Sequence, residues 1–228
     1  MNSNYLSKYL DVRFNKEIDH PKLENKGMVI TISRDTGCDG VPIIKEVIKQ
    51  LNSKSKTQPW HFVSKEIFEK SAKDLHINPE IFDKLEDVKD KGFIDAIIES
   101  FSKENYPSDF KIKKTYKEVI QTIEKQGGVI ILGRAGVAIV KHSKRNLHIK
   151  LTASTDWRLD KLAKEHGTSK AKTLKHLALS DQNRSNFRKY YMGRAIKPSD
   201  YDIIFNVGTL TKKEICSALV SMIEEKAK

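Results

Sequence analysis

Five short apolar runs, rich in β-branched residues and separated by charged sequence, constrain the fold of this chain more than any other feature. They are residues 28–33, 60–63, 129–134, 147–151 and 202–207. Short apolar runs bounded by glycine, proline or polar residues are typical of buried strands. Strands that alternate with helices predict a parallel sheet with helices on both faces. We therefore expect an α/β fold with a five-stranded parallel sheet flanked by helices.

The spacing of these runs predicts the organisation of the chain. Residues 1–27 form an N-terminal extension, and residues 28–228 form one α/β domain. Two long, charged helical segments follow the second and fourth strands, and we expect them to be inserted lobes at 64–126 and 157–194. The second of these segments is broken at Gly167, since glycine commonly ends helices. A closing amphipathic helix is expected near the C-terminus.

Composition excludes several classes of protein. Hydrophobic residues make up 38% of the 228 residues and charged residues 32%, which suits a globular core with a charged surface. No apolar run is long enough to span a membrane. Residues 1–14 are polar and lack the apolar stretch of a secretory signal. Cys38 and Cys216 are too few for a disulfide framework, so we expect a cytoplasmic protein.

The net charge of +12 requires a separate interpretation. The lysines are spread along the chain, which favours solvated helix faces together with a site for a nucleotide. A nucleic-acid-binding module is the alternative, but the sequence contains no RNP, zinc-ligand or basic-zipper pattern. The histidines also lack metal-ligand spacing, so no metal site built from protein ligands is predicted. The oligomeric state is left open.

The first strand leads through a glycine-bearing turn, residues 34–40, into an apolar helix in which Pro42 suits the first turn. A turn of this kind points backbone N–H groups at an anion, and the helix dipole adds to the attraction. The complete phosphate-loop pattern, G-x-x-x-x-G-K-[ST], ends in a lysine and a hydroxyl. Here the turn ends in Gly40 and Val41, so both are missing.

Several blocks, taken in order, resemble the cytidylate kinase-like family. Residues 32–43 read I-S-R-x-x-G-x-x-G-x-x-I, which is similar to the opening of that family. The later matching blocks are residues 60–67, 129–134, 152–158, 181–184 with Tyr190-Tyr191, and 201–206. The resemblance covers roughly residues 28–224, and the ordered set is far more specific than any single block.

This resemblance implies a P-loop nucleoside monophosphate kinase-like fold. The segment 64–126 would be the monophosphate-binding insert and the segment 157–194 the lid. The implied reaction transfers the terminal phosphoryl group of ATP, with Mg²⁺, to CMP or a related pyrimidine monophosphate. Nucleotides are then the expected partners, and neither a membrane nor a nucleic acid is expected to be one.

The resemblance also assigns site residues. ATP is expected at Ser33, Arg34, Gly37, Cys38, Asp39 and Gly40. The catalytic candidates are Arg34, Arg158, Asp181, Arg184 and Arg188, and the monophosphate candidates are Ser64, Gly133 and Arg134. Arginine suits such a site because its planar guanidinium group binds phosphate oxygens in pairs. The three candidates between 181 and 188 are spaced to share one face of a helix.

Each assignment has a structural alternative. Asp181 and Arg184 could form only a surface helix pair, Arg158 could be a solvated helix residue, and Arg134 could be a structural arginine at a strand end. The aromatic residues of these blocks are expected to pack in the core or the lid and not against a base: Trp60, Phe62, Tyr190 and Tyr191.

The main departure from the family lies in the turn itself, where the usual G-S-G-G reads G-C-D-G. Asp39 replaces a glycine at a point where phosphates approach the backbone, and Pro42 lies near the usual hydroxyl. Two unit charges ~4 Å apart repel by ~4 kcal/mol at an effective dielectric constant of ~20. Aspartate is also a preferred helix N-cap. Whether the chain is an active kinase or a catalytically impaired nucleotide-binding or regulatory protein is therefore left open.

Overall fold

The computed structural model describes residues 27–54, 59–63 and 109–227. The chain divides into two compact units, Met28–Val63 with Gly128–Lys228 and Met1–Gly27 with Ser64–Gly127. We call the first the sheet unit. Its elements are β1 (Val29–Arg34), α2 (Val41–Lys54), β2 (His61–Val63), β3 (Val129–Leu132), α7 (Gly136–Ile139), β4 (Leu147–Thr152), α8 (Thr155–His166), α9 (Lys170–Met192), the 3₁₀ helix η1 (Pro198–Asp200), β5 (Ile203–Asn206) and α10 (Lys212–Lys226).

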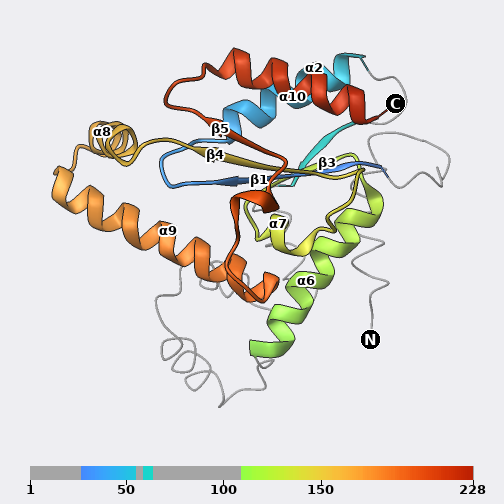
Figure 1. The fold of residues 1–228 in the computed structure, drawn as a ribbon, viewed down its shortest axis with the longest axis horizontal. Coiled ribbons are helices and arrows are strands. Elements are labelled where there is room, and N and C mark those ends of the chain that lie inside the picture. The colour runs from blue at the N-terminus through green and yellow to red at the C-terminus, as the bar shows by residue number, and fades with distance from the viewer. Residues whose placement is uncertain (1–26, 55–58, 64–108, 228) are drawn as a thin grey trace. The chain divides into compact units, whose positions relative to one another are not determined.

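The five strands form one parallel sheet in the order β2-β3-β1-β4-β5, as predicted. β1 is central, because the chain first builds the β2–β3 side and then returns to build the β4–β5 side (Figure 1). In open α/β sheets, ligands bind outside the carboxyl ends of the strands where the order reverses in this way. The segment that follows β1 is therefore in the position where such folds bind their ligands.

One face of the sheet carries the main hydrophobic core. Ile30 and Ile32 of β1 belong to a buried cluster with apolar residues of α2 and α10. Figure 1 shows these two helices above the sheet and α7 and α9 below it. Alternate strand residues point to opposite faces, and Thr31 accordingly packs against Gly136 of α7. Trp60 and Phe62 pack against the apolar cluster, which confirms the core interpretation of both.

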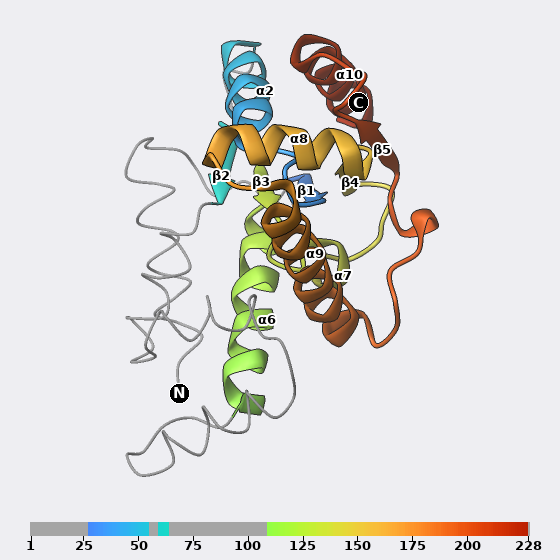
Figure 2. The same ribbon diagram turned by 90° about the vertical axis from the view of Figure 1, so that its left-hand side faces the viewer.

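The predicted lid sequence forms the two helices α8 and α9, seen from their own side in Figure 2. Gly167 ends α8 in the left-handed conformation, with φ of 61°, so the predicted break is confirmed. The side chains of Ser154 and Ser169 accept hydrogen bonds from backbone N–H groups in the first turns of the two helices. These caps fix where each helix begins relative to the sheet.

The end of the third strand differs from the prediction. The run 129–134 was expected to be a strand throughout, but β3 ends at Leu132. Gly133, Arg134 and Ala135 have φ values of 71°, 55° and 50°, so the chain turns sharply into α7. A left-handed conformation is costly for residues with a side chain and is found most often where tertiary contacts impose it. Sequence periodicity does not reveal such a turn.

In the other unit, the described element is α6 (Asp109–Gln126). Its buried residues Tyr116, Val119, Ile120 and Ile123 share one face, as the spacing of an amphipathic helix requires. Gly127 follows the helix with φ of 67°. The predicted insert and extension otherwise lie outside the described residues.

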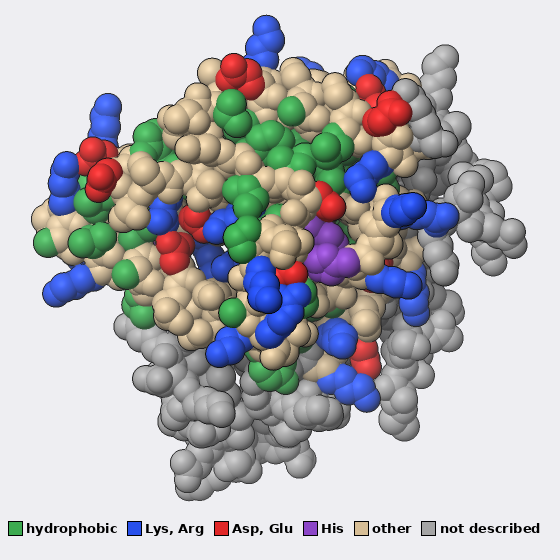
Figure 3. Space-filling model, in the orientation of Figure 1, with side chains coloured by type: hydrophobic (Ala, Val, Ile, Leu, Met, Phe, Trp, Pro, Cys, Tyr) green, Lys and Arg blue, Asp and Glu red, His purple; other side chains and the backbone are tan. Residues whose placement is uncertain are grey.

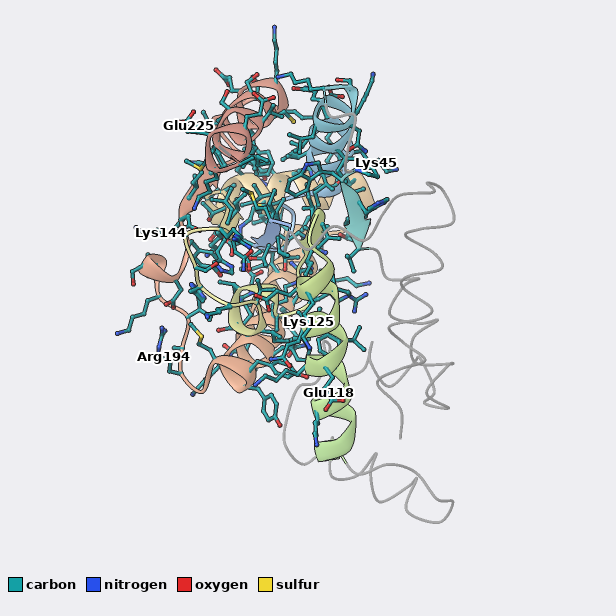
Figure 4. The ribbon with its side chains drawn as sticks, turned by 90° about the vertical axis from the view of Figure 1, so that its right-hand side faces the viewer. Lys45, Glu118, Lys125, Lys144, Arg194 and Glu225 are labelled. Carbon is teal, nitrogen blue, oxygen red and sulfur yellow. The ribbon has the colours of Figure 1, made fainter. Side chains whose placement is uncertain are left out.

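The surface of the described chain is strongly charged. On the face drawn in Figure 3, basic side chains occur over many elements, and histidine side chains gather at one place. In the stick drawing of Figure 4, Lys45 of α2, Glu225 of α10, Lys144 before β4 and Arg194 after α9 all lie at the periphery. No helix among the described residues combines the length and the apolar character that crossing a membrane requires.

Candidate functional site

The β1–α2 loop, residues 35–40, lies directly after the central strand. Gly37 has φ of 89°, which favours glycine, and the backbone N–H of Cys38 donates to the carbonyl of Asp35 to close a turn. Gly40 packs closely against the sheet, since a Cβ there would stand 2.9 Å from the side chain of Leu132. The backbone conformation therefore favours glycine at position 37, whereas a side chain at position 40 would require Leu132 to shift.

The loop leaves several backbone donors for a ligand. Within the described part of the chain, the backbone N–H groups of Gly37, Asp39 and Gly40 donate no hydrogen bond. Gly40 is the residue before α2, and its carbonyl accepts from the N–H of Ile44. Unsatisfied N–H groups at a helix start attract anions. This geometry is suited to a phosphate group.

Asp39 is exposed, and its carboxylate accepts from the backbone N–H of Val41 at 3.0 Å. Because α2 begins at Val41, Gly40 is the N-cap residue of this helix. The interpretation of Asp39 as the N-cap is therefore wrong by one residue. The expected effect of the carboxylate is nevertheless present, since it takes an N–H donor at the start of the helix. Asp39 also places a negative charge beside the remaining donors of the loop.

A second carboxylate reaches the loop from α9. Asp181 accepts hydrogen bonds from the backbone N–H and the hydroxyl of Thr36, both at 2.7 Å. Its other oxygen lies 2.6 Å from a guanidinium nitrogen of Arg158. Burial raises the pKa of Asp181, but the hydrogen bonds from Thr36 and Arg158 outweigh burial, so the net pKa lies below its ordinary value. Asp181 is thus an ionised link between the β1–α2 loop and helices α8 and α9.

Arg158 of α8 is buried and also donates to the carbonyl of Thr36 at 3.2 Å. The alternative of a solvated helix residue is therefore wrong. Asp181 bonds with Thr36 and Arg158 and not with Arg184 in this structure, so the alternative of a simple surface pair does not describe it either. Charge-assisted hydrogen bonds of this kind are among the stronger ones in proteins.

Two further residues hold the loop, and sequence reasoning missed both. Lys161 of α8 donates from Nζ to the carbonyl of Gly37 at 2.9 Å. Asp35 accepts from the hydroxyl of Thr152 at 2.6 Å and pairs with Lys150 at 3.1 Å, which ties the loop to β4. The spacing of Arg158 and Lys161, one helical turn apart, was the available signal for Lys161.

Two further arginines, Arg34 and Arg184, lie near the ends of β1 and β3. Arg184 of α9 donates to the carbonyl of Arg34, the last residue of β1, across a long 3.4 Å. A guanidinium nitrogen of Arg34 lies 3.1 Å from the place where a Cβ would stand at Gly133. The structure therefore brings Arg34 close to both Gly133 and Arg184 at the ends of β1 and β3.

The structure also gives the positions of the other predicted site residues, except where they lie outside the described chain. Arg134 follows β3 in the left-handed region, and Arg188 is partly buried on α9 with its Nε enclosed by protein. Ser33 is buried near the end of β1. Ser64 lies outside the described residues. Tyr190 and Tyr191 stack edge to face, with ring centroids 5.0 Å apart, as expected for packing within the lid.

Neither cysteine has the character of a nucleophile. Both thiols are free and buried. Burial, with the nearby carboxylate of Asp35, raises the pKa of Cys38 to about 11. The thiol of Cys38 is therefore protonated at neutral pH, and covalent chemistry through a thiolate is not available in the loop. What the site offers is hydrogen-bond donors and fixed positive charge.

This combination of fold and site defines a nucleotide kinase-like α/β protein. The cytidylate kinase-like family matches residues 29–209, which is more than half of the chain. The chain belongs to this family, and the resemblance noted in the sequence is confirmed.

Comparison with solved structures shows the same fold. A structure of an uncharacterized protein from Eubacterium ventriosum is similar with a TM-score of 0.59 and 18% identity, over 88% of this chain and 99% of that one. A shikimate kinase from Bacteroides thetaiotaomicron gives a TM-score of 0.45 at 11% identity, over 87% and 96% of the two chains. The second likeness is too weak to carry an argument.

One curated protein also matches part of the sequence. A uronate isomerase from Corynebacterium glutamicum is 27% identical over 100 residues, which is 43% of this chain and 19% of that protein. The chain thus spans about a fifth of the length of this relative.

Proposed function

We propose that this protein is a nucleoside monophosphate kinase that transfers the γ-phosphoryl group of ATP to a pyrimidine monophosphate such as CMP. The main support for this proposal is that helices α8 and α9 contact the β1–α2 loop at the carboxyl end of the central strand. Arg158 and Asp181 join these three segments through Thr36. Membership of the cytidylate kinase-like family supports the same reaction class.

The chemistry requires little covalent help from the protein. An oxygen of the acceptor monophosphate attacks the γ-phosphorus of ATP, and the bond to the β–γ bridging oxygen breaks to release ADP. The products are ADP and a nucleoside diphosphate. Catalysis of such a transfer rests on alignment of the two phosphates and on cations around the moving group.

In this proposal the loop N–H groups of Gly37, Asp39 and Gly40 bind ATP phosphates. Arg34 and Arg184, which meet at the end of β1, stabilise the transferred group. Arg188 is one turn further along α9 and extends the same face. Gly133 and Arg134 after β3, together with Ser64, bind the acceptor. Asp181 and Arg158 act as positioning residues that hold loop and lid together.

Mg²⁺ would enter with the nucleotide. This ion usually keeps several waters and binds one or two carboxylates together with phosphates. Among the described residues there is no group of three or more His, Cys, Asp or Glu side chains that could hold a metal ion. When bound, Mg²⁺ would neutralise phosphate charge.

The cytoplasm supplies ATP and monophosphates together, and we propose it as the compartment. Two buried free thiols are consistent with a reducing environment. The charge of +12 leaves nucleic acid as a rival partner. Binding to a generic oligonucleotide measured over a range of salt concentrations tests that rival, because release of counterions from a nucleic acid gives a steep salt dependence.

The decisive experiment is a coupled assay of ADP formation with ATP, Mg²⁺ and each nucleoside monophosphate, beside calorimetric titration with ATP. We expect turnover that is highest with CMP or another pyrimidine monophosphate. Turnover only with a purine monophosphate would overturn the assignment of the substrate. Tight ATP binding without turnover on any monophosphate would overturn the kinase and leave a nucleotide-binding protein on the same fold.

A further inference from the structure

The β1–α2 loop lacks its own cation. Where the complete pattern has lysine and a hydroxyl residue, this chain has Gly40 and Val41. In the structure, however, a lysine reaches the loop from another element. The ammonium group of Lys161 on α8 lies 2.9 Å from the carbonyl oxygen of Gly37, in the middle of the loop.

Two cations of α8 contact the loop, and they differ in how their charge is engaged. Arg158 lies 2.6 Å from Asp181, and its side chain is only 10% exposed, so its charge is already balanced by a partly buried carboxylate. Within the described chain, the carboxylate nearest to Lys161 is that of Glu165, at 3.4 Å, and the side chain of Glu165 is 50% exposed. Solvent-screened pairs of this kind contribute little. Lys161 is therefore the cation of α8 that can change partner at low cost.

The stem of Lys161 is positioned by its helix. Its Nζ lies 5.8 Å from the ring centroid of Trp157, four residues earlier, and Trp157 packs against the main apolar cluster. A lysine side chain carries three donors on a flexible chain and can turn from one acceptor to another nearby. Gly37 holds Lys161 at the loop by a single neutral carbonyl, which is a weaker acceptor than a phosphate oxygen.

We propose that Lys161 supplies, from α8, the phosphate-binding cation that the β1–α2 loop lacks. When a nucleotide binds, the ammonium group leaves the carbonyl of Gly37 and binds a phosphate oxygen at the β or γ position. No covalent bond is made or broken in this step. The inference rests on the proposed function in one respect, since it takes the loop as the site of a polyphosphate.

The test compares Lys161→Ala and Lys161→Arg with Lys164→Ala, which removes an exposed lysine from the same helix. Calorimetric titrations use ATP, AMP and inorganic tripolyphosphate, and melting temperatures are measured in parallel. We expect Lys161→Ala to weaken binding of ATP and tripolyphosphate about tenfold or more, in the range of a charge-assisted hydrogen bond. Binding of AMP should change little, Lys161→Arg should retain much of the affinity, and Lys164→Ala should resemble the wild type.

The outcomes separate the two proposals. If the wild type binds ATP and Lys161→Ala binds it equally well, the role of Lys161 is overturned while the kinase stands. If Lys161→Ala weakens ATP and AMP to the same extent, Lys161 supports the structure of the loop and not a phosphate, and the inference fails. If binding depends on Lys161 but no monophosphate is phosphorylated, the inference stands and the kinase fails. Absence of binding of ATP and of tripolyphosphate to the wild type overturns both.

Discussion

The two faces of the central strand β1 are built on different principles. Ile30 and Ile32 point into an apolar cluster with α2 and α10. On the other face Thr31 and Ser33 are buried polar residues, and the hydroxyl of Thr31 lies 2.8 Å from Nδ1 of His148. Apolar burial is stabilising in many arrangements, whereas a buried polar group requires a partner at the right distance. The first face should govern stability, and the second should respond to protonation.

The carboxyl end of β1 continues this contrast. Beyond Arg34 the chain enters a loop held by ion pairs and hydrogen bonds to α8, α9 and β4. Interactions between charges depend on pH, salt and competing ions. A phosphate can therefore compete for the cations and hydrogen-bond donors at this end. It cannot compete for the apolar contacts of Ile30 or Ile32.

The largest effect is expected on the apolar face. Ile32→Ala would leave a cavity under α2 and α10 and should lower the free energy of unfolding by about 2–5 kcal/mol. Ile204→Ala on β5, where the residue is 43% exposed, is the matched control and should change it by less than about 0.5 kcal/mol. Urea denaturation of both variants tests the contrast. Equal losses would show that the two positions are packed alike, against the structure.

The polar face should make stability depend on pH through His148. Burial, with the adjacent His142, lowers the pKa of His148 to about 4, although Asp202 opposes the shift. The rings of His142 and His148 stack with centroids 4.1 Å apart. Between pH 6.5 and about 4 the unfolded chain takes up a proton on this residue and the folded chain does not. Stability is therefore full above pH 6.5 and falls as the pH is lowered, by up to about 3 kcal/mol.

Denaturant titrations from pH 7 to pH 4 measure this loss, and His148→Asn supplies the control. The variant has no group that titrates at position 148, so its stability should fall less steeply across the same range. The carboxylate of Asp181, whose pKa is also lowered, loses its contribution only below the ordinary aspartate pKa of about 3.9. A slope that is unchanged in His148→Asn would place the titrating group elsewhere.

The apolar face could be predicted from the sequence, because periodicity reports which residues are buried. All five strands, α2, α10 and the break at Gly167 follow from short β-branched runs, apolar helical spacing and a single glycine. The contact of Thr31 with His148 could not be predicted in this way. The two residues are 117 positions apart and meet because the β1–β4 register places them opposite one another.

The candidate site shows the same limit. The sequence placed Asp181, Arg184 and Arg188 on one helix face, and the structure brings the first two to the loop and to the end of β1. The partners themselves, Thr36 for Asp181 and Gly37 for Lys161, depend on where α8 and α9 dock. Backbone groups have no signature in a sequence, so hydrogen bonds to a loop carbonyl or amide become visible only in three dimensions.

At the carboxyl end of β1, ligand binding and stability should separate. Arg184→Ala removes one long hydrogen bond of 3.4 Å, so the melting temperature should change little. Nucleotide binding or turnover should weaken about 10- to 100-fold, as expected for loss of a charge-assisted hydrogen bond to phosphate. Lys175→Ala, on the opposite face of α9, is the control. A large loss of stability with unaltered binding would assign Arg184 to the structure alone.

A further contrast lies between the two carboxylates at the loop, which differ in how their charge is balanced. Asp181 is paired with Arg158, whereas the structure gives Asp39 no ion pair within the described chain. Asp39 therefore adds net repulsion where phosphate should approach, and it occupies the N–H of Val41. Removing it should strengthen ATP binding by ~1–3 kcal/mol after screening. Glycine is a tolerable replacement near a helix start, so the loss of stability should be smaller.

Calorimetric titration with ATP, with and without Mg²⁺, compares the wild type with Asp39→Gly and Asp39→Asn. Asparagine removes the charge and keeps an acceptor for the N–H of Val41, so the two variants separate repulsion from occupation of the donor. If repulsion dominates, both variants bind ATP more tightly than the wild type, and the gain shrinks as salt is added. A gain in Asp39→Gly alone assigns the effect to the released N–H. If the wild type already binds tightly and neither variant differs, the carboxylate does not face the phosphates, and the loop functions as it stands.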